Sequence, residues 1–319
     1  MGWKILCTFD ISGAPEARAA VEAVGELICL PADREQVLAG LKDVDAYLAS
    51  ASVIIDAEFL DHAPNLKVIG SPSTGTDHMH LAEIDRRGIT RFDIAKEYDL
   101  INSFSATSEL AFGMLLALNR GIVPAQAQAK QGIWARERFT GFQLLGKTLG
   151  ILGLGRLGKI SARIGQGFGM KVIAHDTADV KAPGVEMVGF EELLQRADVL
   201  TIHIHLRPET DGLIGRDAFK LMTPNAILLN TSRGRIVDEA ALLEALETNQ
   251  IAAAGLDVVD GEWLSQDHLR EHPLIAYSRT HNNLLVLPHI GGATSESIYG
   301  ARVFMANRLA QFIRSTTIA

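Results

Sequence analysis

The amino-acid sequence predicts an α/β protein with two parallel-sheet domains. The chain has 319 residues, which is more than one hydrophobic core usually supports. Short apolar runs that suit buried strands alternate with helical patterns along almost the whole chain. One long apolar helical pattern, at residues 105–120, separates two such alternating series. Each series therefore corresponds to one domain.

The first series contains four strand-like runs with helical patterns between them. The expected strands are KILCTF (4–9), ELICL (26–30), AYLAS (46–50) and KVIG (67–70). The expected helices are EARAAVEAV (16–24) and REQVLAGL (34–41). This order is typical of a parallel sheet that helices cover on both faces.

The second series follows the long helix at 105–120, whose first serine and threonine residues are expected to cap it. Seven strand-like runs follow: TLGILGLG (148–155), KVIAHD (171–176), EMVGF (186–190), VLTIHI (199–204), AILLNTS (226–232), IAAAGLDV (251–258) and LLVLPH (284–289). No glycine- or serine-rich linker marks the domain boundary.

Composition and charge narrow the class of protein. The net charge of −8 leaves no basic footprint, so neither nucleic acid nor an anionic membrane is an expected partner. Cys7 and Cys29 lie in apolar runs and are expected to be buried, reduced thiols. The N-terminal stretch lacks the features of a signal peptide, and the apolar helical run 110–118 is too short to span a bilayer. A cytoplasmic enzyme is expected.

A glycine loop follows the first strand of the second series. Gly153, Gly155 and Gly158 have the G-x-G-x-x-G spacing, between a strand and the start of a helix. In dinucleotide-binding domains these positions allow a tight turn, close approach of a pyrophosphate and close helix–strand packing. The next expected strand ends at Asp176, whose carboxylate suits the ribose hydroxyls of NAD and repels the 2′-phosphate of NADP. The alternative is a structural turn followed by an aspartate that caps the strand.

Four motifs together resemble the D-isomer-specific 2-hydroxyacid dehydrogenase family, which includes phosphoglycerate dehydrogenase and glyoxylate/hydroxypyruvate reductase. The motifs are GKTLGILGLGRLG (146–158), LLNTSRGRIVDEAALLEAL (228–246), GLDVVDGE (255–262) and LPHIGGAT (287–294). The resemblance implies two doubly wound domains, with a Rossmann NAD-binding domain at 103–291 inserted in a flavodoxin-like substrate domain at 1–102 and 292–319. It also implies a homodimer.

The resemblance places three catalytic residues at Arg233, Glu262 and His289, and each suits hydride transfer to a 2-oxo acid. His289 can donate a proton to the carbonyl oxygen in reduction and accept it back in oxidation. Glu262 beside it would favour the charged imidazole and fix the ring. Arg233 can hold the substrate carboxylate and polarise the carbonyl. Taken singly, each residue could instead be an ordinary loop or turn side chain.

The resemblance also assigns binding residues. Around NAD it places Arg156 and Leu157 in the glycine loop, with Thr231, Ser232 and Asp257; Asp257 would hold the nicotinamide carboxamide or simply cap its strand. Around the substrate it places Thr74 and Gly75, whose backbone would hold the carboxylate, together with Arg233 and Ser50.

Several positions depart from the family pattern. Ser50 and Ser52 occur where phosphoglycerate enzymes tend to carry an arginine, which argues against a phosphorylated substrate. Ser73 and Thr74 replace the usual glycine and valine. Trp263 and His205 replace the usual prolines beside the catalytic glutamate and the cofactor. The pattern His203-x-His205 has no third ligand nearby in the sequence, so no metal is expected.

The sequence therefore predicts an NAD-dependent oxidoreductase that interconverts a small 2-oxo acid and an (R)-2-hydroxy acid of the hydroxypyruvate, glyoxylate or phosphoglycerate type. Two alternatives share the scaffold. One is a dehydrogenase of another small oxyanion, such as phosphite or formate. The other is an NAD-sensing interaction protein similar to corepressors, which also retain the catalytic residues.

Overall fold

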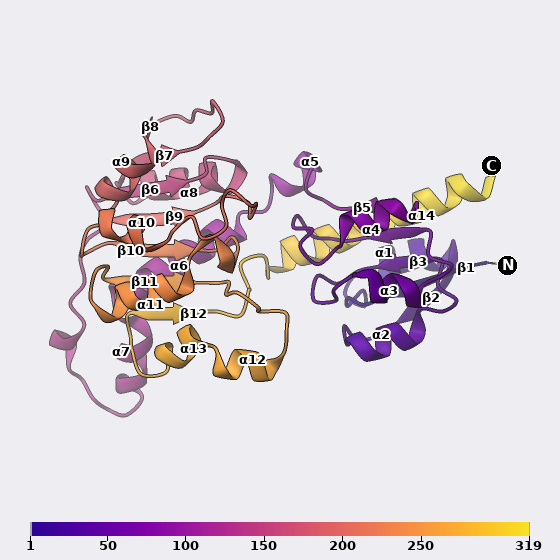
Figure 1. Ribbon diagram of the computed structural model, residues 1–319, viewed down its shortest axis with the longest axis horizontal. Coiled ribbons are helices and arrows are strands. Elements are labelled where there is room, and N and C mark those ends of the chain that lie inside the picture. The colour runs from indigo at the N-terminus through magenta and orange to yellow at the C-terminus, as the bar shows by residue number, and fades with distance from the viewer. Residues whose placement is uncertain (1, 319) are drawn as a thin grey trace. The chain divides into compact units, whose positions relative to one another are not determined.

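The computed structural model describes residues 2–318, and the side chains of residues 2–316, as two compact α/β units (Figure 1). The first unit comprises Met1–Phe104 and Ala293–Ala319, and the second comprises Ser105–Gly292. The boundaries expected from the sequence fall within two residues of this division. Each unit contains one sheet with helices on both faces, so the predicted fold class is confirmed.

The sheet of the first unit has five parallel strands in the order β2-β1-β3-β4-β5. This is the flavodoxin-like doubly wound order. The strands are β1 (Trp3–Cys7), β2 (Gly25–Cys29), β3 (Ala46–Leu48), β4 (Val68–Gly70) and β5 (Thr90–Phe92). The first four are those expected from the apolar runs, and β5 was not expected.

Helices cover the two faces of this sheet because alternate strand residues point to opposite sides. Ile5 and Cys7 pack against α1 (Pro15–Glu22) and α14 (Ser295–Ile318), which lies along this sheet (Figure 1). Leu6 and Tyr47 pack on the other face, against α2 (Arg34–Gly40), α3 (Ala57–His62) and α4 (Leu81–Arg86). A short helix, α5 (Tyr98–Ile101), follows β5.

The sheet of the second unit has seven parallel strands in the order β12-β11-β10-β9-β6-β7-β8. The strand order reverses between β6 and β9, and ligands of doubly wound sheets bind at such a switch point. The strands are β6 (Thr148–Leu152), β7 (Lys171–His175), β8 (Val185–Met187), β9 (Val199–Ile202), β10 (Ile227–Asn230), β11 (Ala253–Leu256) and β12 (Leu284–Val286). All seven overlap the expected runs, although the run expected at 186–190 shares only Glu186 and Met187 with β8 and ends at Phe190, the first residue of α9.

Helices again cover both faces. One face packs against α6 (Ala106–Asn119) and α8 (Arg156–Gly167). The other face packs against α9 (Phe190–Arg196), α10 (Arg216–Leu221), α11 (Glu239–Glu247) and α13 (Pro273–Ser278). The remaining helical segments are α7 (Ile122–Ala129), η1 (Arg136–Arg138), η2 (Gly234–Ile236) and α12 (Gln266–Glu271).

Three local expectations need correction. Ser105 is the N-cap of α6, but its hydroxyl donates to the carboxylate of Glu109 and does not cap the backbone. Cys29 is exposed, because β2 is an edge strand; Cys7 is buried, and burial raises the pKa of its thiol to about 12. By length and composition the segment Tyr98–Asn119 could span a membrane, although α6 packs in the sheet core with Ala111, Phe112, Met114 and Leu115 buried.

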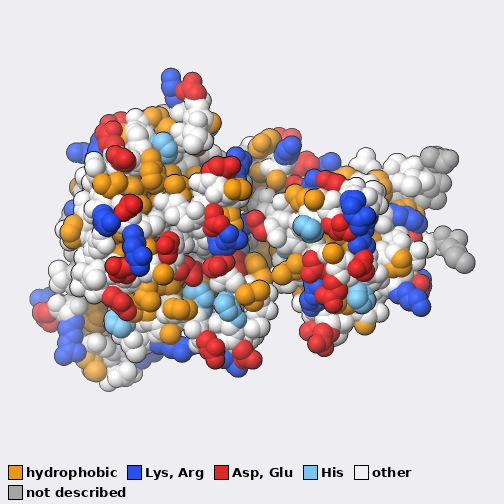
Figure 2. Space-filling model, viewed as in Figure 1, with side chains coloured by type: hydrophobic (Ala, Val, Ile, Leu, Met, Phe, Trp, Pro, Cys, Tyr) orange, Lys and Arg blue, Asp and Glu red, His pale blue; other side chains and the backbone are white. Residues whose placement is uncertain are grey.

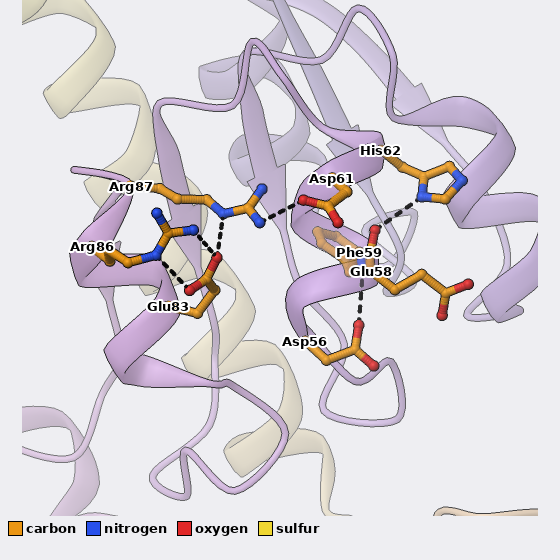
Figure 3. A network of polar contacts seen from close by, with 8 residues as sticks. All are labelled: Asp56, Glu58, Phe59, Asp61, His62, Glu83, Arg86 and Arg87. Carbon is orange, nitrogen blue, oxygen red and sulfur yellow. Dashed lines mark hydrogen bonds and ion pairs between the residues drawn. The ribbon is translucent and has the colours of Figure 1, made fainter.

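Charged side chains are mixed over the surface of both units. Figure 2 shows acidic and basic side chains interspersed across the visible face, without a continuous basic patch there. On the first unit they form a network between α3 and α4 (Figure 3), where Arg87 pairs with both Asp61 and Glu83. Arg86 also pairs with Glu83, and the two arginines lower the pKa of that carboxyl to about 2.

Candidate active site

The glycine loop has the geometry that its spacing predicts. Gly153 follows β6 with φ of +94°, where a Cβ would lie 2.8 Å from the carbonyl oxygen of His203. A Cβ at Gly158 would overlap the carbonyl oxygen of Gly153, so this glycine is needed for close helix–strand packing. At Gly155 an added Cβ would meet nothing within 4 Å, which leaves space directly in front of the N-terminus of α8. The loop is therefore shaped to accept a phosphate.

Asp176 lies just after β7 and holds the loop. Its Oδ2 accepts from the backbone N–H of Leu154 at 2.7 Å, and its Oδ1 accepts from that of Ala178 at 2.9 Å. The carboxylate is thus fixed at the edge of the glycine loop, at the position expected for a ribose ligand. Arg156 and Leu157 begin α8, and burial lowers the pKa of Arg156 while leaving it charged at any working pH.

The turn after β10 carries three predicted residues and one that sequence reasoning missed. Buried Asn230 accepts from the N–H of Ser232 at 3.0 Å and donates to the carbonyl of Arg233 at 2.9 Å, which closes the turn. Ser232 Oγ donates to the carbonyl of Ile202 on β9 at 2.9 Å. Thr231 Oγ1 is buried without a hydrogen-bond partner. The sequence feature that could have indicated this role is the position of Asn230, at the end of an apolar strand and shortly before a serine and a glycine.

The turn also packs against the loop that carries Glu262. Arg233 Nη1 donates to the carbonyl of Ser232 at 2.7 Å, which orients the guanidinium. A Cβ on Gly234 would overlap the peptide between Val259 and Asp260. The glycine after Arg233 therefore lets this turn pack directly on the segment that leads to Glu262.

His289 and Glu262 form the predicted pair. Nδ1 of His289 lies 2.7 Å from Oε1 of Glu262, and the two side chains are 30% and 14% exposed. Oε2 of Glu262 lies 3.4 Å from the backbone N–H of Val259. His289 has φ of +53°, a conformation that is uncommon for a residue with a side chain and often marks a functional site. With Nδ1 on the carboxylate, Nε2 is the nitrogen that can exchange a proton with a substrate.

Asp257 holds the backbone that carries His289. Its Oδ1 accepts from the N–H of Ile290 at 2.8 Å and its Oδ2 accepts from that of Gly291 at 2.7 Å. Its carbonyl accepts from the N–H of His289 at 2.9 Å. Burial raises the pKa of this carboxyl. These contacts fit the second interpretation of Asp257, a cap at the end of its strand. A contact between Asp257 and the nicotinamide carboxamide stays a prediction.

One departure from the family pattern, Trp263, has a clear place. The ring of Trp263 lies 5.3 Å from the ring of His289, tilted by 39°, so the tryptophan forms an aromatic wall beside this histidine. His203 and His205 follow β9, which ends at Ile202. Nε2 of His203 lies 2.9 Å from Ser161 Oγ and 3.1 Å from Thr201 Oγ1. Over the described residues, no group of three or more His, Cys, Asp or Glu side chains is arranged to hold a metal ion.

Three of the four predicted substrate residues lie in the first unit, after neighbouring strands, and Arg233 lies in the second unit. Ser50 follows β3, and its hydroxyl lies 2.7 Å from that of Ser52. Thr74 and Gly75 follow β4, and the N–H of Gly75 donates to Ser73 Oγ at 3.2 Å. Ser73, which replaces the usual glycine, therefore engages one of the N–H groups expected to hold a carboxylate.

Known proteins with similar sequences and structures identify the family. The model of the D-isomer-specific 2-hydroxyacid dehydrogenase NAD-binding domain matches residues 112–291. The chain belongs to this family. It is 38% identical to a glyoxylate reductase of Thermococcus litoralis over 88% of this chain and 84% of the relative. It is 34% identical to a D-3-phosphoglycerate dehydrogenase of Methanocaldococcus jannaschii over 98% of this chain, and spans 57% of that relative's length.

Solved structures agree with this assignment. A D-lactate dehydrogenase of Aquifex aeolicus, complexed with NAD and lactic acid, superposes with a TM-score of 0.82 at 25% identity, covering 98% of this chain and 96% of the other. The TT0316 protein of Thermus thermophilus gives a TM-score of 0.80 at 33% identity, covering 98% and 96%. The predicted family, and NAD as the cofactor, are therefore confirmed.

Proposed function

We propose that this protein reduces a small 2-oxo acid to the (R)-2-hydroxy acid with NADH and catalyses the reverse oxidation with NAD. The observation that carries the proposal is the His289–Glu262 pair at 2.7 Å, in the same unit as a glycine loop shaped for a dinucleotide. Such a pair is what a carbonyl reduction needs, because the oxygen gains negative charge as hydride arrives.

Three residues perform the chemistry in this proposal. Arg233 pairs with the substrate carboxylate and polarises the carbonyl. His289 donates a proton from Nε2 to the carbonyl oxygen, and Glu262 stabilises the imidazolium from the Nδ1 side. Bound NADH supplies the hydride that goes to the carbonyl carbon.

The residues of the second unit fit the cofactor. The open space at Gly155, in front of the N-terminus of α8, suits the pyrophosphate. Asp176 would accept from the adenosine ribose hydroxyls. Thr231 Oγ1, buried without a partner, would gain one from the cofactor. Gly153, Gly158, Arg156, Leu157, Ser232 and Asp257 complete the proposed binding site.

The substrate class that we propose is of the glyoxylate or hydroxypyruvate type. Two similar proteins, one from Thermococcus litoralis and one from Paecilomyes thermophila, are named glyoxylate reductases. The hydroxyls of Ser50 and Ser52 bond to one another where a phosphate-binding enzyme would offer a cation. Thr74 and Gly75 are proposed to hold the carboxylate of the same substrate.

The test is NADH consumption with glyoxylate, hydroxypyruvate, 3-phosphohydroxypyruvate, pyruvate and a branched 2-oxo acid. We expect turnover of the first two, with much weaker use of the phosphorylated acid. Ser50→Arg should improve the phosphorylated substrate relative to hydroxypyruvate. NADH binding without turnover of any member of the panel would contradict the proposal and favour another oxyanion or an NAD-sensing role.

We also propose a homodimer built on the second unit. The segment from α7 to β6 exposes large apolar side chains: Val123 is 58% exposed, Trp134 88% and Leu145 72%. A pocket of about 550 Å³, lined by Phe139, Phe142 and Phe168, lies beside the same segment. Apolar surface of this kind is typical of a subunit interface.

Light scattering after size exclusion should give the mass of two chains. Val123→Glu combined with Trp134→Glu should give the mass of one. Ile54→Glu, at an exposed apolar residue of the first unit, is the matched control and should stay dimeric. A wild-type protein with the mass of one chain would contradict the dimer.

We propose a cytoplasmic location as well, because Cys7 and Cys29 are both free thiols. Immunoblots of cell fractions test this, and recovery outside the cytoplasmic fraction would contradict it.

A further inference from the structure

A second histidine–carboxylate pair lies next to the loop of the catalytic glutamate. Nε2 of His272 lies 3.0 Å from Oε2 of Glu239, and the two side chains are 4% and 20% exposed. Neither residue belongs to the proposed acid/base set or to the proposed binding sites. Because burying ionisable side chains is costly, the contacts of this pair call for a physical explanation.

Glu239 connects the pair to the catalytic loop. It is the first residue of α11, directly after the N-cap Asp238. Its Oε1 accepts from the backbone N–H of Asp260 at 2.8 Å. Asp260 is two residues before Glu262, and Gly261 between them has φ of +71°. The loop therefore turns sharply at Gly261. Before the turn lies the N–H of Asp260, which Glu239 holds, and after it lies Glu262, whose side chain contacts His289.

His272 fixes the other oxygen of Glu239. It lies between α12 and α13, and its Nδ1 is buried without a hydrogen-bond partner. A buried N–H without a partner costs more free energy than a buried acceptor without one. The ring proton of His272 therefore lies on Nε2, where it points at Glu239, and the unpaired Nδ1 is an acceptor. His268, one turn earlier, packs edge-on against His272 with ring centroids 5.9 Å apart. A Cβ on Gly261 would lie 2.5 Å from Nε2 of His268.

The segment from Val259 to Glu262 is thus held from several directions. The Arg233–Gly234 turn packs on the peptide between Val259 and Asp260. Glu239 holds the N–H of Asp260, and His268 packs against Gly261. Without the Glu239 contact, the N–H of Asp260 would need another partner and the loop would be free to shift.

We propose that Glu239 and His272 are positioning residues that hold the backbone of Asp260–Glu262, so that Glu262 stays in contact with Nδ1 of His289. The inference rests on the proposed acid/base role of that pair. The titratable groups that face Glu239 are His272 and Asp260, and His268 adjoins His272. Burial raises the pKa of the Glu239 carboxyl, so the contact with Asp260 weakens in acid.

Glu239→Ala removes both bonds and tests the role. A misplaced catalytic group costs up to about 100-fold in rate, so we expect kcat to fall roughly 10- to 100-fold. The dissociation constant of NADH should stay within about twofold, because the glycine loop and Asp176, which are proposed to hold its pyrophosphate and ribose, lie outside the segment that shifts. The alkaline limb of the pH–rate profile for reduction should move to lower pH, since a displaced Glu262 no longer favours the imidazolium.

Two further variants keep the result interpretable. Glu239→Gln keeps an acceptor for the N–H of Asp260 and should retain more activity than Glu239→Ala; it also serves if the alanine variant does not fold. Glu244→Ala is the matched control, because Glu244 lies on the same helix and pairs with Arg216 at the surface. A folded Glu239→Ala with wild-type kcat and an unmoved alkaline limb would overturn the proposal.

Failure of the proposed function gives a different result. In that case the wild type turns over no 2-oxo acid, whatever residue stands at 239. NMR of the imidazole nitrogens then tests the positioning role without substrate. The nitrogen signals of His289, whose Nδ1 contacts Glu262, should differ between Glu239→Ala and the wild type at one pH, and identical signals would overturn the proposal.

Discussion

His289 follows β12 and His203 follows β9 of the same sheet, but the two side chains have different surroundings. His289 is half-exposed, has a positive φ and contacts a carboxylate. His203 contacts two hydroxyls, and its Nδ1 is buried without a partner. Burial lowers the pKa of His203 to about 4, so it is neutral at physiological pH. The partner and the access of solvent thus leave His289 able to exchange a proton with a bound molecule, whereas His203 is held as a structural side chain.

The largest expected effect is a loss of enzyme activity that is much greater for a substitution of His289 than for one of His203. His289→Ala should lower kcat for 2-oxo acid reduction by roughly 10²- to 10⁴-fold, the usual contribution of general acid–base catalysis. NADH binding, measured by fluorescence, should be retained. His203→Gln should lower kcat less than roughly tenfold, since it transfers no proton to the substrate. Equal losses in the two variants would contradict the comparison.

The next effect concerns stability in acid. The folded-state pKa of His203 is about 4, and that of an unfolded histidine is about 6.5. The unfolded state therefore binds the proton first, and stability is lost as the pH falls from about 6.5 to about 4, by about 3 kcal/mol. Urea unfolding at pH 7 and pH 4.5 measures it. The wild type should lose more stability than His203→Gln over this range, and parallel losses would show that His203 is not the cause.

A smaller effect tests the carboxylate beside His289. Glu262→Gln keeps the shape but removes the charge, so kcat for reduction should fall roughly 10- to 100-fold, and the alkaline limb of the profile should move to lower pH. Steady-state assays from pH 5 to pH 9 give both values. Glu271→Gln, an exposed residue at the end of α12, is the control and should match the wild type.

The smallest effect concerns the aromatic wall. Trp263→Phe keeps a ring beside His289 and should change kcat by less than about threefold, whereas Trp263→Ala opens the site to water and should cost more. The same assay compares the two variants. A large loss in the phenylalanine variant would show that the indole N–H has a role beyond contact.

Local patterns predicted most of the architecture. Each expected strand is present, because a run of apolar residues between turn residues favours a strand whichever way the sheet is ordered. The glycine spacing predicted the loop after β6, because only glycine adopts φ of +94° without strain. Cys29 was predicted wrongly, since an apolar run does not reveal which strand will lie at the edge of the sheet.

The sequence by itself determined the two-domain α/β fold, the family and NAD as the cofactor, and it singled out Arg233, Glu262 and His289 as the proposed catalytic residues, because these depend on short motifs and their order. Only the tertiary structure decided what Asp257 binds, that Asn230 closes the turn before Arg233, and that Glu239 pairs with His272. Those contacts join loops from different strand ends. Their partners depend on how the strands are ordered and how the loops turn, which no local pattern records.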